Sequence, residues 1–321
     1  MTNSCKDSDK SPWLVLAPIR GVTDAAFRSA HAAIFGGFDE ALAPFVVPER
    51  AHPVRARDLA EVSPGRNRAL PTVPQILADD AELFLQTASL LAESGCKVVN
   101  WNLGCPHPMV TRRKRGAGLL PHPDRIEAFL SQVVPAVGLE VSVKLRLGMN
   151  DPSEILQVIP VLNRFALREV IIHPRTAAQM YKGKVDLDAF ERVAPLCSHP
   201  VVYNGDLCDA SGFQVLSRRF PGISRWMIGR GALSDPSLAL AIRGQTLEPA
   251  DRLQRYRRLH DSMLAHYTEV LQGQAHVIDK MAGLWSYWVD AIPGKRKLIR
   301  RLLKIRELDR FKAGVDQILG D

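Results

Sequence analysis

Short apolar runs rich in β-branched residues alternate along the chain with stretches whose apolar positions follow helical spacing. Each run ends at a Pro, Gly, Asn or Asp, and a helix-like stretch follows it. The runs predict eight strands, at 13–19, 41–48, 71–78, 97–105, 141–148, 169–175, 200–206 and 225–231. The alternation therefore predicts a repeated strand–helix unit.

Residues 80–95 show the helical pattern most clearly, and 123–134 and 151–165 resemble them. Gly95 is a suitable residue to end the first of these helices. Five of its side chains are expected on one face of that helix: Leu83, Phe84, Thr87, Leu90 and Leu91.

None of the eight runs alternates strictly between apolar and polar residues, as a half-exposed sheet would. Eight buried strands in about 230 residues fit an α/β fold of the TIM-barrel type, (β/α)8, better than an open doubly wound sheet, which is the alternative. Polar residues at the C-terminal ends of nearly all the runs favour the barrel, because barrel enzymes build their sites there. We expect a tail over 1–12 that is disordered, the barrel over 13–244 and a smaller helical domain over 245–321.

The C-terminal region is helical in pattern and disproportionately basic. Residues 245–321 hold 14 Lys and Arg against 10 Asp and Glu, which is half of the net charge of +8 in 77 of 321 residues. Residues 295–306 hold seven basic and no acidic side chains, with Leu298, Leu302 and Ile305 at the spacing of an apolar helix face. This helix is either a solvated basic face or a surface that contacts phosphates.

Composition excludes several classes of protein. A hydrophobic content of 46% and a charged content of 24% are those of an ordinary soluble globular protein. No apolar run approaches the ~20 residues of a membrane span, and the first residues lack the apolar core of a signal peptide. The five cysteines are scattered and form no metal-ligand spacing. We expect a monomeric cytoplasmic protein without a metal site, whose positive charge favours a polyanionic partner.

Seven of the eight predicted strands carry a polar residue, glycine or proline at or near the C-terminal end. In a barrel these ends meet at one mouth. They are Pro18, Gln75, Asn102 with Cys105, Lys144 with Arg146, His173 with Arg175, Asn204 with Gly205, and Gly229 with Arg230.

Three of these positions have alternative explanations. The glycine turns at Gly205 and Gly229 are ordinary strand ends, or they form the phosphate site that barrels build after their last two strands. His173 can be a satisfied core histidine, whereas Lys144, within an otherwise apolar strand, needs a counter-charge. An anionic or electron-rich cofactor would supply that charge.

Cys105 lies between a glycine and a proline in NLGCPHPMVTRRKRGAG, residues 102–118. Judged alone, its thiol is either a small buried hydrophobe or a reactive group beside a polyanion. We expect Cys96, Cys197 and Cys208 to be small buried hydrophobes and Cys5 to lie in the tail.

Six segments, taken in order, resemble the tRNA-dihydrouridine synthases across roughly residues 13–243. They are LAPIRGVTDAAFR, NLGCP with the following GAGLL, VSVKLRLG, IIHPRT, VVYNGD and MIGRGAL. The resemblance implies a TIM barrel that holds FMN at its mouth and a helical C-terminal domain. It also implies reduction of the uracil C5=C6 bond in RNA, most often tRNA, with NADPH as reductant.

The resemblance also implies roles for individual residues. Cys105 would be the proton donor, Asn102 would help to hold the uracil, and Arg175 would lie near the substrate. Apart from the resemblance, we expect basic residues at the mouth and in the basic run and tail to contact the RNA backbone by their charge, namely Arg146, Arg112, Arg113, Arg115, Arg300 and Arg301. Ten residues would bind FMN: Ala17, Pro18, Gln75, Lys144, His173, Asn204, Gly205, Asp206, Gly229 and Arg230.

Three other functions are compatible with the sequence. The same flavin barrel could act on a small pyrimidine, as dihydroorotate oxidoreductases do, although the basic C-terminal domain argues against this. The same reaction could be carried out on ribosomal RNA. A barrel that binds RNA without catalysis is disfavoured by the joint presence of Cys105, Lys144 and His173.

Overall fold

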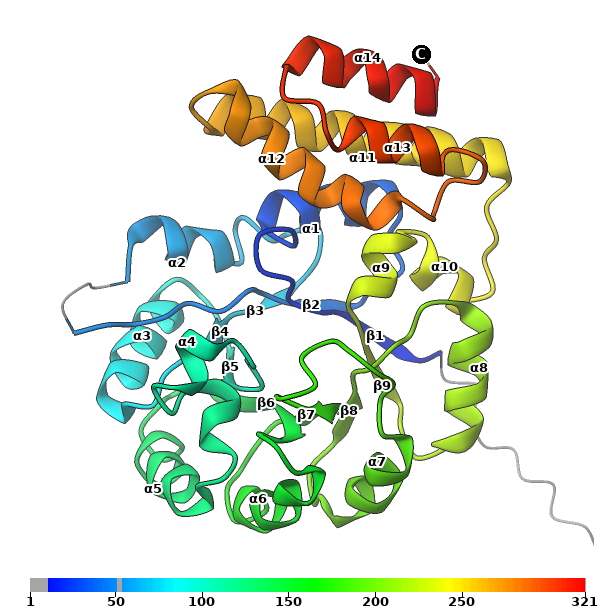
Figure 1. Cartoon of the computed structure of the whole chain (residues 1–321). Helices are drawn as coiled ribbons and strands as arrows, with labels where there is room; N and C mark the ends of the chain where they lie inside the picture. Colours follow the sequence, from blue (N-terminus) through cyan, green and yellow to red (C-terminus); the bar gives the residue numbers. More distant parts are fainter. Residues whose placement is uncertain (1–10, 51–53, 321) are drawn as a thin grey trace, which may run out of the picture.

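The strands form a nearly closed parallel barrel surrounded by helices, as a computed structural model that describes residues 11–50 and 54–320 shows (Figure 1). Hydrogen bonding orders the strands β3-β2-β1-β9-β8-β7-β6-β5-β4. The strands are β1 (Trp13–Leu16), β2 (Glu40–Leu42), β3 (Thr72–Val73), β4 (Gln75–Ile76), β5 (Val98–Leu103), β6 (Glu140–Gly148), β7 (Val170–Thr176), β8 (Val201–Tyr203) and β9 (Arg225–Ile228).

The TIM barrel is confirmed, and the open sheet is wrong, because the first and last strands pair. β1 pairs with β9 over four residues, from Trp13↔Arg225 to Leu16↔Ile228. Each predicted run contains a strand, but the run at 71–78 contains two. Its first half pairs with β2 and its second half with β5, and between them Pro74 has no N–H to donate.

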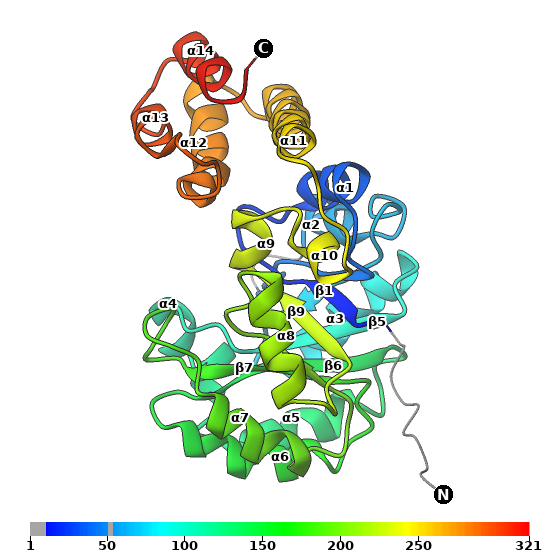
Figure 2. The same ribbon diagram turned by 90° about the vertical axis from the view of Figure 1, so that its right-hand side faces the viewer.

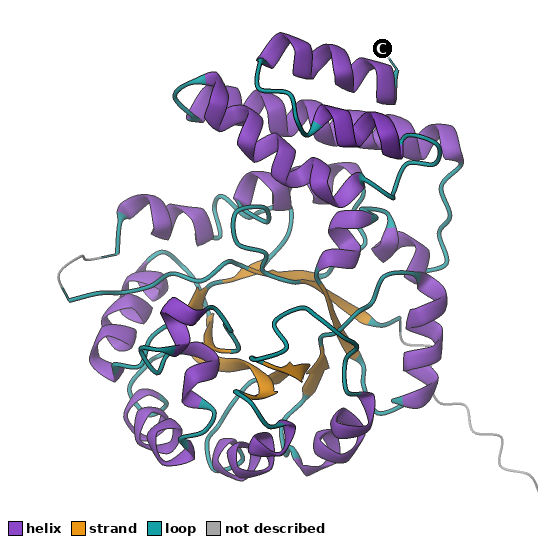
Figure 3. Ribbon diagram, in the orientation of Figure 1, coloured by secondary structure: helices purple, strands orange, loops and turns teal. Residues whose placement is uncertain are grey.

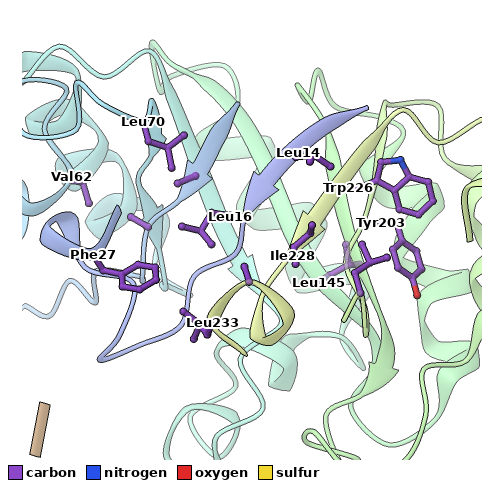
Figure 4. Close-up of a cluster of buried hydrophobic side chains, with 14 of the residues drawn as sticks. Leu14, Leu16, Phe27, Val62, Leu70, Leu145, Tyr203, Trp226, Ile228 and Leu233 are labelled. Atoms are coloured by element: carbon purple, nitrogen blue, oxygen red, sulfur yellow. The ribbon is translucent and has the colours of Figure 1, made fainter. Parts of the chain in front are cut away.

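The two faces of each strand meet different surroundings. Val99, Trp101 and Leu103 of β5 belong to the main apolar cluster against the helices, whereas Asn100 and Asn102 alternate with them and face the barrel interior. In Figure 4, Leu14 and Leu16 of β1 point into that main cluster with Ile228 of β9. A second apolar cluster is formed by residues in or directly after the strands, which alternate with those of the main cluster: Val15, Ala17, Leu42, Val73, Ile171, Val202 and Met227.

Helices surround the strands (Figure 3), and aspartate starts several of them. Asp24, Asp80, Asp186 and Asp209 each accept a hydrogen bond from a backbone N–H of the first turn, the usual N-cap arrangement. The helices of the barrel are α1 (Ala25–Ile34), α2 (Ala56–Val62), α3 (Ala81–Glu93), α4 (Pro108–Thr111), α5 (Pro123–Val133), α6 (Ile155–Leu162), α7 (Leu187–Val193), α8 (Ala210–Arg219), α9 (Arg230–Ser234) and α10 (Leu238–Ile242), with 3-10 turns η1 (Gly116–Leu119), η2 (Pro152–Glu154) and η3 (Ala194–Leu196).

The predicted helices at 80–95, 123–134 and 151–165 are present as α3, α5 and η2 with α6. Gly95 follows α3 with φ +96°, as expected of a helix stop. The predicted apolar face of α3 is correct for Phe84, Thr87 and Leu91 but wrong for Leu90, which is 38% exposed. Leu90 lies at the edge of the face, just beyond the arc that contacts the barrel.

The C-terminal region consists of α11 (Pro249–Val270), α12 (Gln274–Trp285), η4 (Ser286–Trp288), α13 (Arg296–Leu302) and α14 (Leu308–Leu319). These helices stack on the barrel next to α1 and α9 (Figure 2). The Trp288 indole N–H donates to the Leu233 carbonyl at 3.0 Å, and the Tyr267 hydroxyl donates to the Asp24 carboxylate at 2.8 Å. The helical region is therefore bonded directly to the barrel.

The basic segment 295–306 contains one short helix, α13, and not a helix over its whole length. Ile299 and Leu302 are buried, whereas Leu298 and Ile305 are only half-buried, so the apolar face is displaced from the predicted one. The basic side chains of this segment remain on the surface. No helix between residues 11 and 320, in the part of the chain that is described, is both long and apolar enough to cross a membrane.

Candidate active site at the barrel mouth

Inward-facing polar residues of β5, β6 and β7 lie side by side at the C-terminal end of the barrel. The strand register places Asn102 of β5 beside Lys144 of β6, and Arg146 of β6 beside His173 of β7. The parallel register thus brings together four residues that the sequence places up to 71 positions apart.

The turn that carries Cys105 is held by the side chain of Asn102. Its Oδ1 accepts hydrogen bonds from the backbone N–H groups of Gly104, at 3.0 Å, and Cys105, at 2.9 Å. Its Nδ2 donates to Oε1 of Gln75 at 2.8 Å. Asn102 and Gln75, expected to contact uracil and flavin, therefore each have partners within the protein, and the position of the Cys105 turn depends on them.

Two further polar residues extend this contact into the barrel interior. Nε2 of Gln75 donates to Oδ1 of Asn100 at 2.7 Å, and Nδ2 of Asn100 donates to the Ser142 hydroxyl at 2.8 Å. Neither Asn100 nor Ser142 is among the residues predicted from the sequence. The two-residue periodicity of a strand could have identified them. Asn100 lies two positions before Asn102, and Ser142 lies two positions before Lys144, so each shares the inner face of its strand with a predicted residue.

The loop after Cys105 folds back against the backbone and Cβ of Cys105. Gly116 has φ +55°, and a Cβ there would lie 2.9 Å from the Cys105 carbonyl oxygen and 3.0 Å from Cys105 Cβ. A Cβ on Gly118 would lie 2.5 Å from the Thr111 carbonyl oxygen, and the Ala117 N–H donates to the Cys105 carbonyl at 3.1 Å. The GAG segment is thus required for a compact loop in which the thiol is half-buried.

The basic run in this loop divides into two kinds of residue. Nε of Arg115 donates to Asp79 Oδ1 at 2.6 Å, and this half-buried pair braces the loop. Arg113 lies on the surface, 3.6 Å from Glu49. Arg112 and Lys114 are exposed, and within the described residues neither side chain has an ion-pair partner.

Asp206 holds two arginines on the other side of the mouth. Its carboxylate accepts two hydrogen bonds from the buried Arg175, at 2.9 and 2.5 Å, and one from Arg230 at 3.0 Å. NH1 of Arg175 also lies 3.1 Å from Nε2 of His173. The predicted residues His173, Arg175, Asp206 and Arg230 therefore form one connected group.

The mouth holds more cationic than anionic groups. Burial, together with the nearby charge of Arg146, lowers the pKa of Lys144 to about 7. Burial, together with the nearby charges of Arg146, Lys144, Arg175 and Arg230, lowers the pKa of His173 well below its usual value. Neither Lys144 nor Arg146 has a carboxylate partner among residues 11–50 and 54–320. An anionic ligand would supply the missing counter-charge.

The turns after β8 and β9 approach so closely that only glycine fits. A Cβ on Gly205 would lie 2.8 Å from Val185 Cγ1, and one on Gly231 would lie 1.9 Å from the Leu207 carbonyl oxygen. Gly229 packs against Ala17 at the end of β1, and Asn204 Nδ2 donates to the Met227 carbonyl at 2.9 Å. Ala17 is buried, and Pro18 next to it is half-buried. Paired glycine turns at this place, with Arg230 beside them, are what a phosphate site after the last two strands of a barrel would require.

The residues present therefore fit FMN. The glycine turns and Arg230 suit its phosphate, and Lys144 with His173 provides polar groups for the edge of an electron-rich ring. Burial raises the pKa of the Cys105 thiol, so that the thiol carries its proton at neutral pH. The mouth thus combines a group of buried cationic side chains with a protonated thiol.

The remaining predicted residues lie elsewhere. Arg300 and Arg301 are exposed on α13, apart from the mouth cluster. Cys96 is buried and Cys197 half-buried, but Cys208 is exposed, so its prediction as a buried hydrophobe is wrong; it lies in the loop that precedes α8. Cys5 lies outside the described residues. In the described part of the chain, no three His, Cys, Asp or Glu side chains come together in a way that could hold a metal ion.

Both the sequence and the fold are similar to those of known proteins. The family model for dihydrouridine synthase matches residues 15–319. The chain is 32% identical over 276 residues to a probable tRNA-dihydrouridine synthase of Rhodobacter capsulatus, which covers 84% of this chain and 83% of that protein. It is 34% identical over 246 residues to tRNA-dihydrouridine(16) synthase of Ralstonia nicotianae, with 74% and 75% covered. It is 29% identical over 226 residues to tRNA-dihydrouridine synthase B of Yersinia pestis, with 70% and 68% covered.

Solved structures resemble the fold at low sequence identity. Morphinone reductase superimposes with a TM-score of 0.52 at 12% identity, covering 77% of this chain and 94% of that one. Histamine dehydrogenase from Rhizobium sp. 4-9 superimposes with a TM-score of 0.57 at 10% identity, covering 85% and 49%. At such identities the likeness concerns the barrel architecture alone.

Proposed function

Because the chain belongs to the dihydrouridine synthase family, we propose that it reduces uridine in tRNA to 5,6-dihydrouridine, with bound FMN and with NADPH as reductant. Members of this family are flavin-dependent oxidoreductases, and this chain is one of them. The observation that carries the proposal is the turn held by Asn102, which fixes a protonated thiol at the same mouth as the buried cations Lys144 and Arg146.

The chain would hold FMN with residues from both halves of the mouth. Gly205, Gly229 and Arg230 would bind its phosphate, and Lys144 and His173 would contact the ring. When bound and reduced by NADPH, FMN would supply the hydride that adds to C6 of uracil. The other residues of the predicted FMN set, Ala17, Pro18, Gln75, Asn204 and Asp206, would shape the site.

Cys105 would complete the reduction by protonating C5 of the uracil. Its raised pKa keeps the proton on the thiol at neutral pH until the base can accept it. Donation leaves a thiolate, and the cationic Arg146 and Lys144 lower the energy of that anion. Solvent then returns the proton to the thiol.

The basic surface residues would bind the RNA. A uridine in structured RNA must leave its stack to enter a barrel mouth, so the enzyme must hold the backbone on either side of it. Arg112 and Lys114, near Cys105, and the exposed Arg300, Arg301 and Lys304, in and just after α13, have the charge for phosphate contacts. We propose residues 245–321 as the RNA-binding domain on this basis.

Mapping of dihydrouridine in cells that lack this protein tests the proposal. We expect loss at one tRNA position, and position 16 is the first candidate because the relative named for that position is 34% identical to the chain. Loss of dihydrouridine in ribosomal RNA alone would show that ribosomal RNA, and not tRNA, is the substrate. An unchanged RNA map, with turnover of a free pyrimidine by the purified protein, would contradict the proposal.

The affinity for FMN should fall above pH 7 because of Lys144. Without the cofactor, Lys144 has a pKa of about 7, so at higher pH it is mostly neutral and must take up a proton when an anion binds. The dissociation constant should rise by up to about tenfold per pH unit above pH 7, until the pKa of Lys144 in the complex is reached. Titrations followed by FMN fluorescence measure this change.

The matched variant is Lys144→Met, which keeps the length of the side chain and removes the ionisable group. It should bind FMN more weakly at pH 7 and show no such rise with pH. An equal slope in both proteins would show that another group titrates.

A further inference from the structure

Arg146 makes three hydrogen bonds to backbone carbonyls and none to a carboxylate within the described residues. Its side chain is 2% exposed. Nε donates to the Gly104 carbonyl at 3.0 Å, and NH1 donates to the carbonyls of Thr176, at 2.9 Å, and Met180, at 2.8 Å. A buried guanidinium is costly, so the bonds that satisfy it mark a place where the chain is held firmly.

These carbonyls belong to two separate segments of the mouth. Gly104 directly precedes Cys105, whereas Thr176 ends β7 and Met180 lies in the loop that follows. We call residues 176–186 the Tyr181 loop. Met180 has φ +53°, a conformation that non-glycine residues adopt rarely and that needs support from its surroundings.

The strand ladder does not hold the two segments together at this point. Arg146 pairs with His173, but the next pair is Gly148 with Thr176, so the register shifts where the strands reach the mouth. The Arg146 guanidinium connects the Cys105 turn to Thr176 and Met180, which lie beyond the point where the register shifts. It also lies 5.4 Å from the centre of the Tyr181 ring, and the Arg230 guanidinium lies 5.1 Å from the same ring centre.

We propose that Arg146 is a positioning residue that ties the Cys105 turn to the Tyr181 loop, so that the acid keeps its place across the mouth from that loop. The inference builds on the proposed function, because it takes Cys105 as the acid. It differs from the expectation drawn from the sequence, in which Arg146 contacts RNA. The fork of the guanidinium is essential here, since its N–H groups donate in two directions at once, which a single ammonium group cannot reproduce.

The variant Arg146→Lys separates the fork from the charge. It keeps a cation near Cys105 and removes the bridge. We expect the kcat for RNA reduction to fall by about 100-fold, because displacement of a reacting group by about 1 Å has this effect. The KM for RNA and the rate at which NADPH reduces bound flavin should change by less than about twofold. Amide hydrogen exchange should become faster in residues 104–118 and in the Tyr181 loop together.

Arg28→Lys is the matched control. Arg28 lies in α1 and is 1% exposed. It donates to the carbonyls of Thr23, at 2.7 Å, and Glu61, at 2.8 Å, and to the Asn67 side chain. The same substitution there removes a comparable set of buried bonds. It should lower the melting temperature without changing exchange in either loop of the mouth.

Three outcomes would overturn the proposal: unchanged exchange in both loops, faster exchange in only one of them, or an effect confined to the KM for RNA, which would make Arg146 an RNA contact. Hydrogen exchange needs no RNA, so it still tests the tie if the wild-type protein makes no dihydrouridine and the proposed function fails. If Arg146→Lys does not fold, Arg146→Gln, whose amide can keep one carbonyl bond, is measured in the same way. Amide exchange in both loops of Arg146→Gln that is as slow as in the wild-type protein would also overturn the proposal.

Discussion

Replacement of Cys105 by alanine should abolish dihydrouridine formation while leaving the flavin bound and reducible by NADPH. The turn is fixed by backbone groups, namely the N–H groups that donate to Asn102 and the carbonyl that accepts from the Ala117 N–H, so removal of the sulfur should not displace it. Loss of a general acid lowers rates by about 10²- to 10⁴-fold. Flavin absorbance and single-turnover reduction of tRNA measure the two steps separately.

Cys208→Ala is the control, because Cys208 is exposed and lies in another loop. It should react at the wild-type rate. Loss of flavin or of the fold in Cys105→Ala would make Cys105 a structural residue, and an unchanged rate of RNA reduction would remove it from the mechanism.

Charge reversal of Arg300, Arg301 and Lys304 to glutamate should weaken tRNA binding strongly and leave the flavin steps intact. All three side chains are exposed, and among the described residues none has an ion-pair partner that the substitution would deprive of its charge. Removal of one phosphate interaction reduces the slope of log K against log salt by about 0.7 to 0.9. We expect the affinity to fall by at least about 100-fold at low salt and the slope to be reduced by about 2 to 3.

Reversal of Lys97, Arg192 and Arg218 to glutamate changes the net charge equally at the opposite end of the barrel. Lys97 precedes β5, and the two arginines lie in the last turns of α7 and α8. This variant should bind tRNA almost as the wild type does. An equal decrease in both variants would indicate only a general charge effect. Unchanged turnover after reversal in the α13 segment would favour a small pyrimidine substrate.

The sequence was sufficient to predict the barrel because each strand is buried on both faces and ends in a residue that breaks strands. It could not predict the division at Pro74, since both halves lie within one short run and only the pairing with different neighbours separates them. The strand ends correctly predicted which residues meet at the C-terminal end of the barrel. The sequence could not predict which of these side chains are free to contact a ligand.

The partners of Gln75 and Asn102 illustrate this limit. Their amides contact each other across 27 positions of sequence, and nothing local distinguishes such a contact from a contact with a cofactor. Arg115 is similar: its position in a basic run suggests phosphate binding, yet Asp79, 36 positions earlier, accepts its hydrogen bond. Composition tells which chemistry is present, and the fold determines which groups satisfy one another.

The bond from Trp288 to the Leu233 carbonyl has a consequence for engineering. The main apolar cluster continues without interruption from the barrel strands into α11, α12 and α14, and α9, which begins at Arg230, lies between them. A chimera that joins this barrel to the C-terminal helices of a relative at residue 245 would therefore cut through a shared core. To transfer RNA preference between relatives, the exchanged part should include α9 and the residues that receive Trp288.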